Sequence, residues 1–164
     1  MKTDVISHPF DPVFDGNSKV LILGSFPSVK SREAQFFYGH PQNRFWKVIS
    51  SVFDCDCPQS VEKKKEFLLA NNVALWDVIR SCDIVGSSDS SVKNAVPNDL
   101  SQILKNSSVT RIFANGTLSY NLYNKLCFSQ TGIEALKLPS TSPANAAWSQ
   151  ERLISEWKRL ISNT

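Results

Sequence analysis

A short, uninterrupted apolar segment near the start of the chain constrains the fold more than any other feature. Residues 20–23 read Val-Leu-Ile-Leu, a composition expected for a strand that is buried on both faces of a parallel sheet. Gly24 follows directly and permits a tight turn or a close backbone approach, and Pro27 ends the strand. A strand with such an ending places its loop at the carboxyl edge of an α/β sheet, where ligands usually bind.

The remaining sequence repeats the alternation of strand and helix. We predict further strands at residues 73–76, 111–114 and 135–138. Helices are predicted at residues 43–53, 60–71, 117–127 and 149–161, with another starting near Pro97. This order predicts an α/β fold, a three-layer α/β/α sandwich around a short, central, four-stranded parallel sheet.

The length of 164 residues fits one domain, in which residues 1–18 form an extended lead-in packed on the surface. A polar, serine-rich stretch at residues 86–94 predicts a loop. The net charge of +3 neither requires nor excludes a nucleic-acid partner, which needs only a locally positive face. We expect a cytoplasmic protein, because the chain shows no signal-peptide pattern and no apolar run of membrane-spanning length.

The cysteines do not follow the spacing of a metal or cluster site. Cys55 and Cys57 form a C-x-C pair, while Cys82 and Cys127 are isolated. Neither an iron–sulfur cluster nor a structural zinc site has this spacing. We therefore expect reduced, unpaired thiols and no metal.

Three motifs carry a resemblance to a known family. They are Gly24-Ser25-Phe26-Pro27-Ser28, His40-Pro41-Gln42-Asn43-Arg44-Phe45-Trp46 and Leu138-Pro139-Ser140-Thr141-Ser142-Pro143. Their order and their positions after predicted strands resemble the uracil-DNA glycosylase superfamily, in the branch around the mismatch-specific uracil- and thymine-DNA glycosylases. The resemblance covers residues 20–143.

Two residues that differ from the motifs of other families in the superfamily indicate which family the chain resembles. Phe26 stands where mismatch-specific enzymes carry the Asn that positions the attacking water, and Leu138 opens the last motif where several families have His or Asn. The combination is similar to the hypoxanthine-DNA glycosylase family, which removes deaminated adenine. By that resemblance Asn43 is the catalytic residue, and the enzyme is monofunctional, without a cofactor, a metal or a lysine Schiff base.

Asn43 and Tyr38 suit the chemistry of a flipped base. Asn43 would orient the attacking water through its amide, although an Asn at this position is equally suited to capping the following helix. Tyr38 occupies the position of the stacking aromatic in the resembling enzymes, and its flat ring would contact any base. Ser25 and Phe26 would form the floor of the pocket.

Asp77 and His40 are the candidates for reading the base. Asp77 ends a predicted strand, and its carboxylate could accept a hydrogen bond from N1–H of hypoxanthine while repelling N1 of adenine. A helix cap or an ion pair is the alternative role for Asp77. His40 could donate to the base or to a phosphate, and a buried structural role is the slightly favoured alternative.

The loop after the last strand is the candidate contact with DNA. Ser140, Thr141, Ser142 and Pro143 could grip phosphates through hydroxyl and backbone N–H groups, or form a plain turn. Relatives insert Leu or Arg from this loop into the gap left by the flipped base, and no residue here matches that wedge. Asn115 and Gly116 could approach the pocket, and a strand-end turn is the favoured role for Asn115.

The sequence therefore predicts a monomeric DNA glycosylase that releases hypoxanthine from DNA containing deaminated bases. The alternatives are a uracil- or mismatch-specific glycosylase, a non-catalytic nucleic-acid-binding module with the same fold, and an enzyme that hydrolyses free nucleosides.

Overall fold

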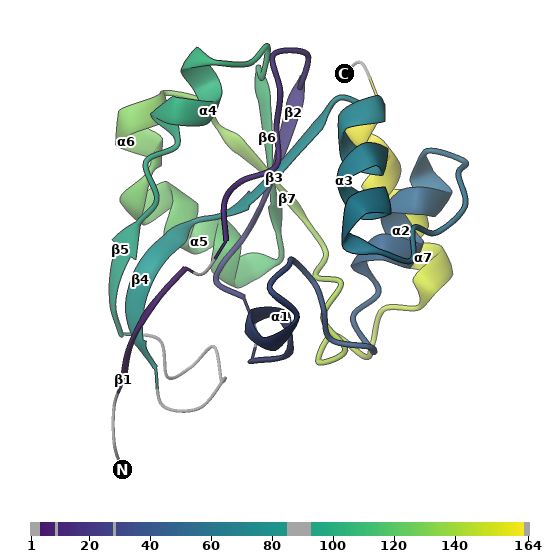
Figure 1. The fold of residues 1–164 in the computed structure, drawn as a ribbon, viewed down its shortest axis with the longest axis horizontal. Helices are drawn as coiled ribbons and strands as arrows, with labels where there is room; N and C mark the ends of the chain where they lie inside the picture. Colours follow the sequence, from purple (N-terminus) through teal and green to yellow (C-terminus); the bar gives the residue numbers. More distant parts are fainter. Residues whose placement is uncertain (1–3, 9, 28, 85–92, 163–164) are drawn as a thin grey trace.

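The computed structural model describes residues 4–8, 10–27, 29–84 and 93–162. Its centre is a four-stranded sheet in the order β3-β2-β6-β7, in which every pairing is parallel. Figure 1 shows helices on both faces of this sheet, which confirms the predicted α/β/α sandwich. The strands are β2 (Val20–Gly24), β3 (Val73–Asp77), β6 (Arg111–Asn115) and β7 (Ala135–Leu138).

The predicted strands are confirmed, and three of them extend one residue beyond the apolar run. Every residue of β2 and β3 is buried, as expected for strands covered on both faces. The added residues are Gly24, Asp77 and Asn115, each at the carboxyl end of its strand. Asp77 and Asn115 have polar side chains and Gly24 has none, so the apolar pattern of each strand ends where the strand reaches the site.

The helices lie in two layers. Helices α2, α3 and α7 cover one face of the sheet, and α4, α5 and α6 cover the other (Figure 1). The predicted helix at residues 43–53 starts later, at Phe45, and the last helix changes to a 3₁₀ turn at residues 158–160. The helices are α1 (Val29–Ala34), α2 (Phe45–Val52), α3 (Val61–Ala70), α4 (Ser101–Lys105), α5 (Thr117–Leu126), α6 (Phe128–Thr131) and α7 (Gln150–Trp157).

A second, antiparallel sheet was not predicted. Its strands β1 (Asp4–Ser7), β4 (Ile79–Ile84) and β5 (Lys93–Pro97) pair in the order β1-β4-β5. Strands β4 and β5 mix charged, polar and apolar residues and pair with register shifts, so no clean alternation marks them. Residues 85–92 lie outside the described residues, and so does most of the predicted polar loop at 86–94.

The surface location predicted for residues 1–18 is wrong for part of this segment. The His8 backbone N–H donates to the Arg80 carbonyl at 2.7 Å, next to the pairing of β1 with β4. The His8 side chain is 3% exposed. Val13 is buried and bridges Leu75 on the edge of the central sheet. The lead-in therefore contributes to the core and brings a titratable side chain inside.

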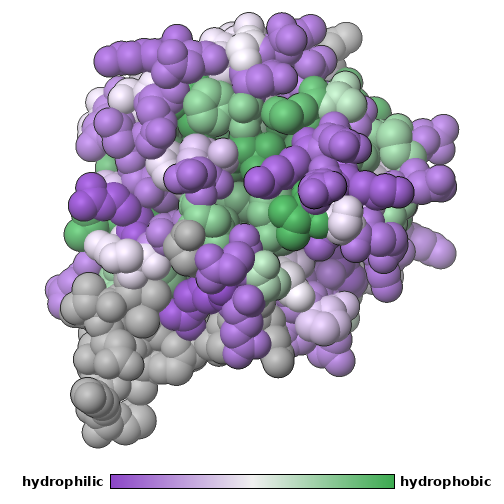
Figure 2. Space-filling model, in the orientation of Figure 1, coloured by the Kyte–Doolittle hydropathy of each residue, from purple (hydrophilic) through white to green (hydrophobic). Residues whose placement is uncertain are grey.

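The loops that follow the parallel strands gather at one edge of the sheet. Figure 1 shows β2 running down to this edge, next to α1 and to the loops before α2 and after β7. In the same orientation, Figure 2 shows apolar groups in a central zone and mainly hydrophilic groups around the lower edge. The carboxyl edge thus combines a buried sheet with a polar rim.

Candidate active site

A cavity of about 670 Å³ opens at the carboxyl edge of the central sheet. Its volume is within the usual range for small-molecule sites. All but one of the side chains proposed from sequence line it; Pro143 is exposed and lies outside the lining. The predicted residues brought together are Ser25, Phe26, Tyr38, His40, Asn43, Asp77, Ser140, Thr141 and Ser142.

Asp77 lies at the floor of the cavity beside Gly24. The two residues are register partners at the ends of β3 and β2. A Cβ atom at Gly24 would lie 2.3 Å from Asp77 Oδ1 and 2.9 Å from the Tyr38 hydroxyl oxygen. Of the two roles that the sequence allowed for Gly24, the structure shows the close approach, because side-chain oxygens occupy the space of its missing Cβ.

We expect Gly24→Ala to lower the free energy of unfolding by about 1–3 kcal/mol, because the new methyl group overpacks the buried Asp77 carboxylate. Urea unfolding measures this change. Gly16→Ala is the matched control, since nothing lies within 4 Å of a Cβ at Gly16. Equal stabilities of the two variants would contradict the close packing of Gly24 on Asp77.

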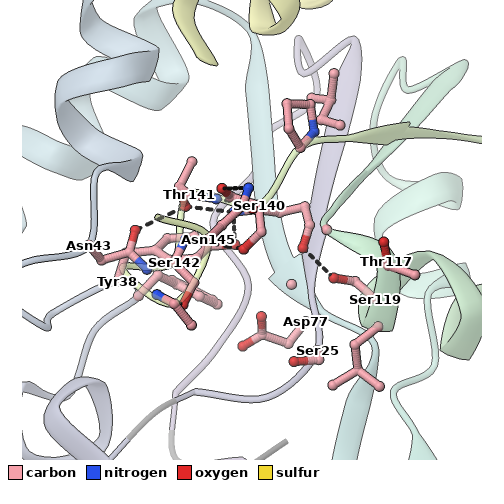
Figure 3. Close-up of a pocket in the computed structure, with 18 of the residues that line it drawn as sticks. Ser25, Tyr38, Asn43, Asp77, Thr117, Ser119, Ser140, Thr141, Ser142 and Asn145 are labelled. Carbon is pink, nitrogen blue, oxygen red and sulfur yellow. Dashed lines mark hydrogen bonds between the residues drawn. The ribbon is translucent and has the colours of Figure 1, made fainter. Parts of the chain in front are cut away.

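Asn43 is held with its amide oxygen turned away from the cavity. Its Oδ1 accepts hydrogen bonds from the Phe45 backbone N–H and from the Thr141 hydroxyl, both at 2.9 Å. The backbone N–H can only donate, so this contact fixes which atom of the amide is the oxygen. Figure 3 shows the oxygen directed to Thr141 and the nitrogen on the cavity side. Asn43 therefore satisfies the start of α2 and still presents an NH₂ donor to the cavity.

Asn115 and Thr141 position Asn43 through a chain of hydrogen bonds. Asn115 Nδ2 donates to Thr141 Oγ1 at 3.0 Å, and Asn115 Oδ1 accepts from the Thr141 backbone N–H at 3.1 Å. Thr141 is fully buried, and its hydroxyl passes the hydrogen bond on to Asn43. The sequence favoured a strand-end turn for Asn115 over an approach to the pocket, and the structure shows Asn115 lining the cavity. Its position at the end of β6, matching Asp77 at the end of β3, is the signal that could have revealed it.

Tyr38 provides an aromatic wall. Its ring stacks on Phe45 with 4.1 Å between the ring centroids, and its hydroxyl oxygen accepts from Asn115 Nδ2 at 3.1 Å. Burial raises the pKa of Tyr38 far above its usual value, and the negative charge of Asp77 raises it further. Tyr38 is therefore a neutral phenol that cannot act as a base at physiological pH.

Arg44 joins the second and third motifs into one unit. Its guanidinium donates to the carbonyl oxygen of Trp148 and, at 3.1 Å, to that of Asn145. Its backbone N–H donates to the Thr141 carbonyl at 3.1 Å. A planar guanidinium that bridges several carbonyls fixes the loop after β7 against the start of α2.

The serines of the loop after β7 and His40 make local hydrogen bonds. The hydroxyl of Ser140 accepts from the Ser142 backbone N–H, and that of Ser142 accepts from the Ala144 N–H, both at 3.1 Å. These bonds form the turn that the composition predicted, with both serines lining the cavity. His40 is partly exposed, and its Nδ1 accepts from the Gln42 backbone N–H at 3.0 Å, so His40 is not the buried histidine that was slightly favoured.

Within the described ranges, no group of three or more His, Cys, Asp or Glu side chains could hold a metal ion. The helices of the same part of the chain include none with the length and apolar character of a membrane span.

A cavity at the carboxyl edge of a short parallel sheet, with an amide donor, an aromatic wall and a carboxylate, is typical of the active site of an α/β enzyme. The family model described as Uracil DNA glycosylase superfamily matches residues 12–161. The chain belongs to the uracil DNA glycosylase superfamily.

Relatives within this superfamily are similar along most of the chain. The Hypoxanthine DNA glycosylase of Methanosarcina acetivorans is 34% identical over 96% of this chain and 99% of its own. The protein of the same name from Methanosarcina barkeri is 39% identical over 58% of this chain and 61% of its own. A solution NMR structure of a candidate uracil DNA glycosylase from M. acetivorans has a TM-score of 0.79 at 30% identity, covering 97% of this chain and all of that one.

Proposed function

We propose that this protein is a monofunctional DNA glycosylase that hydrolyses the N-glycosidic bond of hypoxanthine in DNA and leaves an abasic site. The observation that carries the proposal is the meeting of Tyr38, Asn43 and Asp77, from separate segments, around one cavity. The likeness to proteins named Hypoxanthine DNA glycosylase supports the choice of base. The enzyme would act as a monomer in the cytoplasm.

Binding of the base would begin with stacking. A deoxyinosine flipped out of the duplex presents a flat purine, and Tyr38, supported from behind by Phe45, offers a flat ring. Stacking contributes about 1–3 kcal/mol per base and does not discriminate among bases. Selection of the base must therefore come from the polar groups on the cavity floor.

Asp77 supplies that selection. Hypoxanthine carries a donor at N1, where adenine carries an acceptor, so a carboxylate oxygen attracts the former and repels the latter. Asp77 is 4% exposed, so an unmatched base edge would leave a buried carboxylate oxygen without a partner. Uracil also carries a donor, at N3, which keeps a uracil-releasing activity as the second candidate.

Asn43 would hold the attacking water. An NH₂ donor binds a water molecule by one lone pair of its oxygen and leaves the other for attack on C1′. As the C1′–N9 bond breaks, its electron pair leaves with the base, and the attacking water loses a proton to solvent. Asn43 acts in this scheme by orientation, since an amide has no useful acid–base chemistry at neutral pH.

Ser140 and Ser142 would contact the DNA backbone at the opening of the cavity, with Pro143 exposed beside them. For Thr141 we propose a positioning role in place of a DNA contact, because its hydroxyl is buried and engaged with Asn43.

The test is incubation of the protein in EDTA with labelled single- and double-stranded oligonucleotides that contain one deoxyinosine, deoxyuridine, deoxyxanthosine or mismatched thymine. Alkali then cleaves the strand wherever a base has been released. We expect the deoxyinosine strand to be cleaved fastest. Cleavage led by deoxyuridine would select the uracil-releasing activity instead, and DNA binding without any cleavage would favour a non-catalytic binder.

A further inference from the structure

His8 contacts Asp77, a residue of the cavity lining, from outside the segment that the family model matches, which begins at residue 12. It follows strand β1 directly, and its imidazole Nε2 lies 2.8 Å from Asp77 Oδ2. The two side chains are 3% and 5% exposed, so the contact is shielded from water. The pairing leaves the other carboxylate oxygen, Oδ1, beside Gly24.

The hydrogen bonds of His8 indicate where its protons are. Nδ1 lies 2.8 Å from the carbonyl oxygen of Phe10, which can only accept, so Nδ1 carries a hydrogen. The Phe10 backbone N–H is farther from the same nitrogen, at 3.4 Å, and is the weaker contact. With Nδ1 protonated, Nε2 can donate to Asp77 only if the ring is an imidazolium.

The surroundings of the His8 ring are aromatic, so the contact with Asp77 has no competing water. Aromatic rings enclose the imidazole, with centroid distances of 4.7 Å to Phe10, 5.8 Å to Phe37 and 5.9 Å to Phe26. Tyr38, whose hydroxyl also lies near Asp77, is a neutral phenol. An isolated buried carboxylate is strongly disfavoured, and a paired, hydrogen-bonded one is tolerated.

We propose that His8 is a specificity-determining positioning residue, which keeps Asp77 ionised and turns its Oδ1 toward the base as a pure acceptor. This inference rests on the proposed base-reading role of Asp77. A protonated carboxyl group at Asp77 could donate as well as accept, and would no longer repel N1 of adenine. The N-terminal strand would thus complete the recognition site of the superfamily domain.

The first test determines the protonation state of His8 by NMR, without any substrate. The chain contains two histidines, so a ¹⁵N-histidine-labelled sample gives few imidazole signals, and those missing from His8→Gln belong to His8. We expect both His8 nitrogens to be protonated at pH 7, and Nε2 to lose its proton in Asp77→Asn. A neutral His8 in the unsubstituted protein would overturn the proposal.

The second test asks whether His8 acts through Asp77. We expect His8→Ala to lower kcat/KM for deoxyinosine about tenfold, the size of one lost charge-assisted hydrogen bond. His8→Gln should recover part of the loss, because the glutamine amide can donate to Oδ2. In an Asp77→Ala background, His8→Ala should have no further effect. Independent, multiplying effects of the two alanine variants would overturn the proposal.

The two tests separate this inference from the proposed function. If the unsubstituted protein releases no hypoxanthine while His8 is an imidazolium paired with Asp77, the activity is wrong and the ion pair stands. If hypoxanthine is released but the two variants are uncoupled, the activity stands and the role of His8 is wrong.

Discussion

Asn43→Ala is expected to reduce the single-turnover rate of hypoxanthine release by roughly 10²–10³-fold, the cost of removing one preorganised donor from an active site. Binding of deoxyinosine DNA should change little, because stacking on Tyr38 and the contacts with the DNA backbone remain. Rapid-quench assays at saturating enzyme give the rate, and fluorescence anisotropy gives the affinity. An unchanged rate would remove Asn43 from the mechanism.

Asn43→Asp distinguishes the role of the NH₂ donor in the reaction from the structural role of the amide oxygen. An aspartate keeps the oxygen that accepts from the Phe45 N–H and from Thr141, but it lacks the NH₂ group. We expect this variant to fold normally and to be as slow as Asn43→Ala. Recovery of the rate would show that an acceptor oxygen, and not a donor, is what the reaction uses. Asn43→Ser, which is uncharged and can still accept from Phe45, controls for the added negative charge near DNA.

Asp77→Ala is expected to lower kcat/KM for deoxyinosine by about 100-fold, because the N1–H of the bound base loses a charged acceptor and enters the cavity unpaired. Asp77→Asn should lose less, since its amide oxygen can still accept from N1–H. Steady-state assays with deoxyinosine and deoxyuridine substrates give the change in preference.

Thermal unfolding of both Asp77 variants is the necessary control, because removing Asp77 leaves His8 buried without its partner. Full activity of Asp77→Ala on deoxyinosine would refute the proposed reading of N1–H. A loss of activity that is proportional to the loss of folded protein would show that Asp77 contributes to stability only.

The sheet was accessible from the sequence because its strands are buried on both faces. Continuous apolar runs such as residues 20–23 and 73–76 are typical of strands that are buried on both faces. The spacing of apolar residues and the capping residues predict the helices between them. Ser60 caps α3, because its hydroxyl oxygen accepts a hydrogen bond from the Lys63 backbone N–H. Asn43 in the second motif, together with Tyr38 before it and Asp77 at the end of a predicted strand, lines one cavity.

The antiparallel sheet could not be found in the same way. Strand β4 is half polar, and β5 ends at Pro97, so neither stands out from a loop when read alone. The sheet is completed by the pairing of β4 with β1, which is more than seventy residues away in the chain (Asp4 pairs with Ile84). Such long-range pairing is decided by the packing of the whole domain.

The sequence by itself determined the parallel sheet, the edge at which the site lies and most of the side chains around it, because local composition and strand order specify these. Only the tertiary structure decided what each side chain does there. The orientation of the Asn43 amide depends on Thr141 and Asn115, and the partner of Asp77 is a histidine 69 residues earlier in the chain. Hydrogen bonds between segments that are distant in sequence determine both the orientation of the Asn43 amide and the partner of Asp77. No local sequence pattern predicts such bonds.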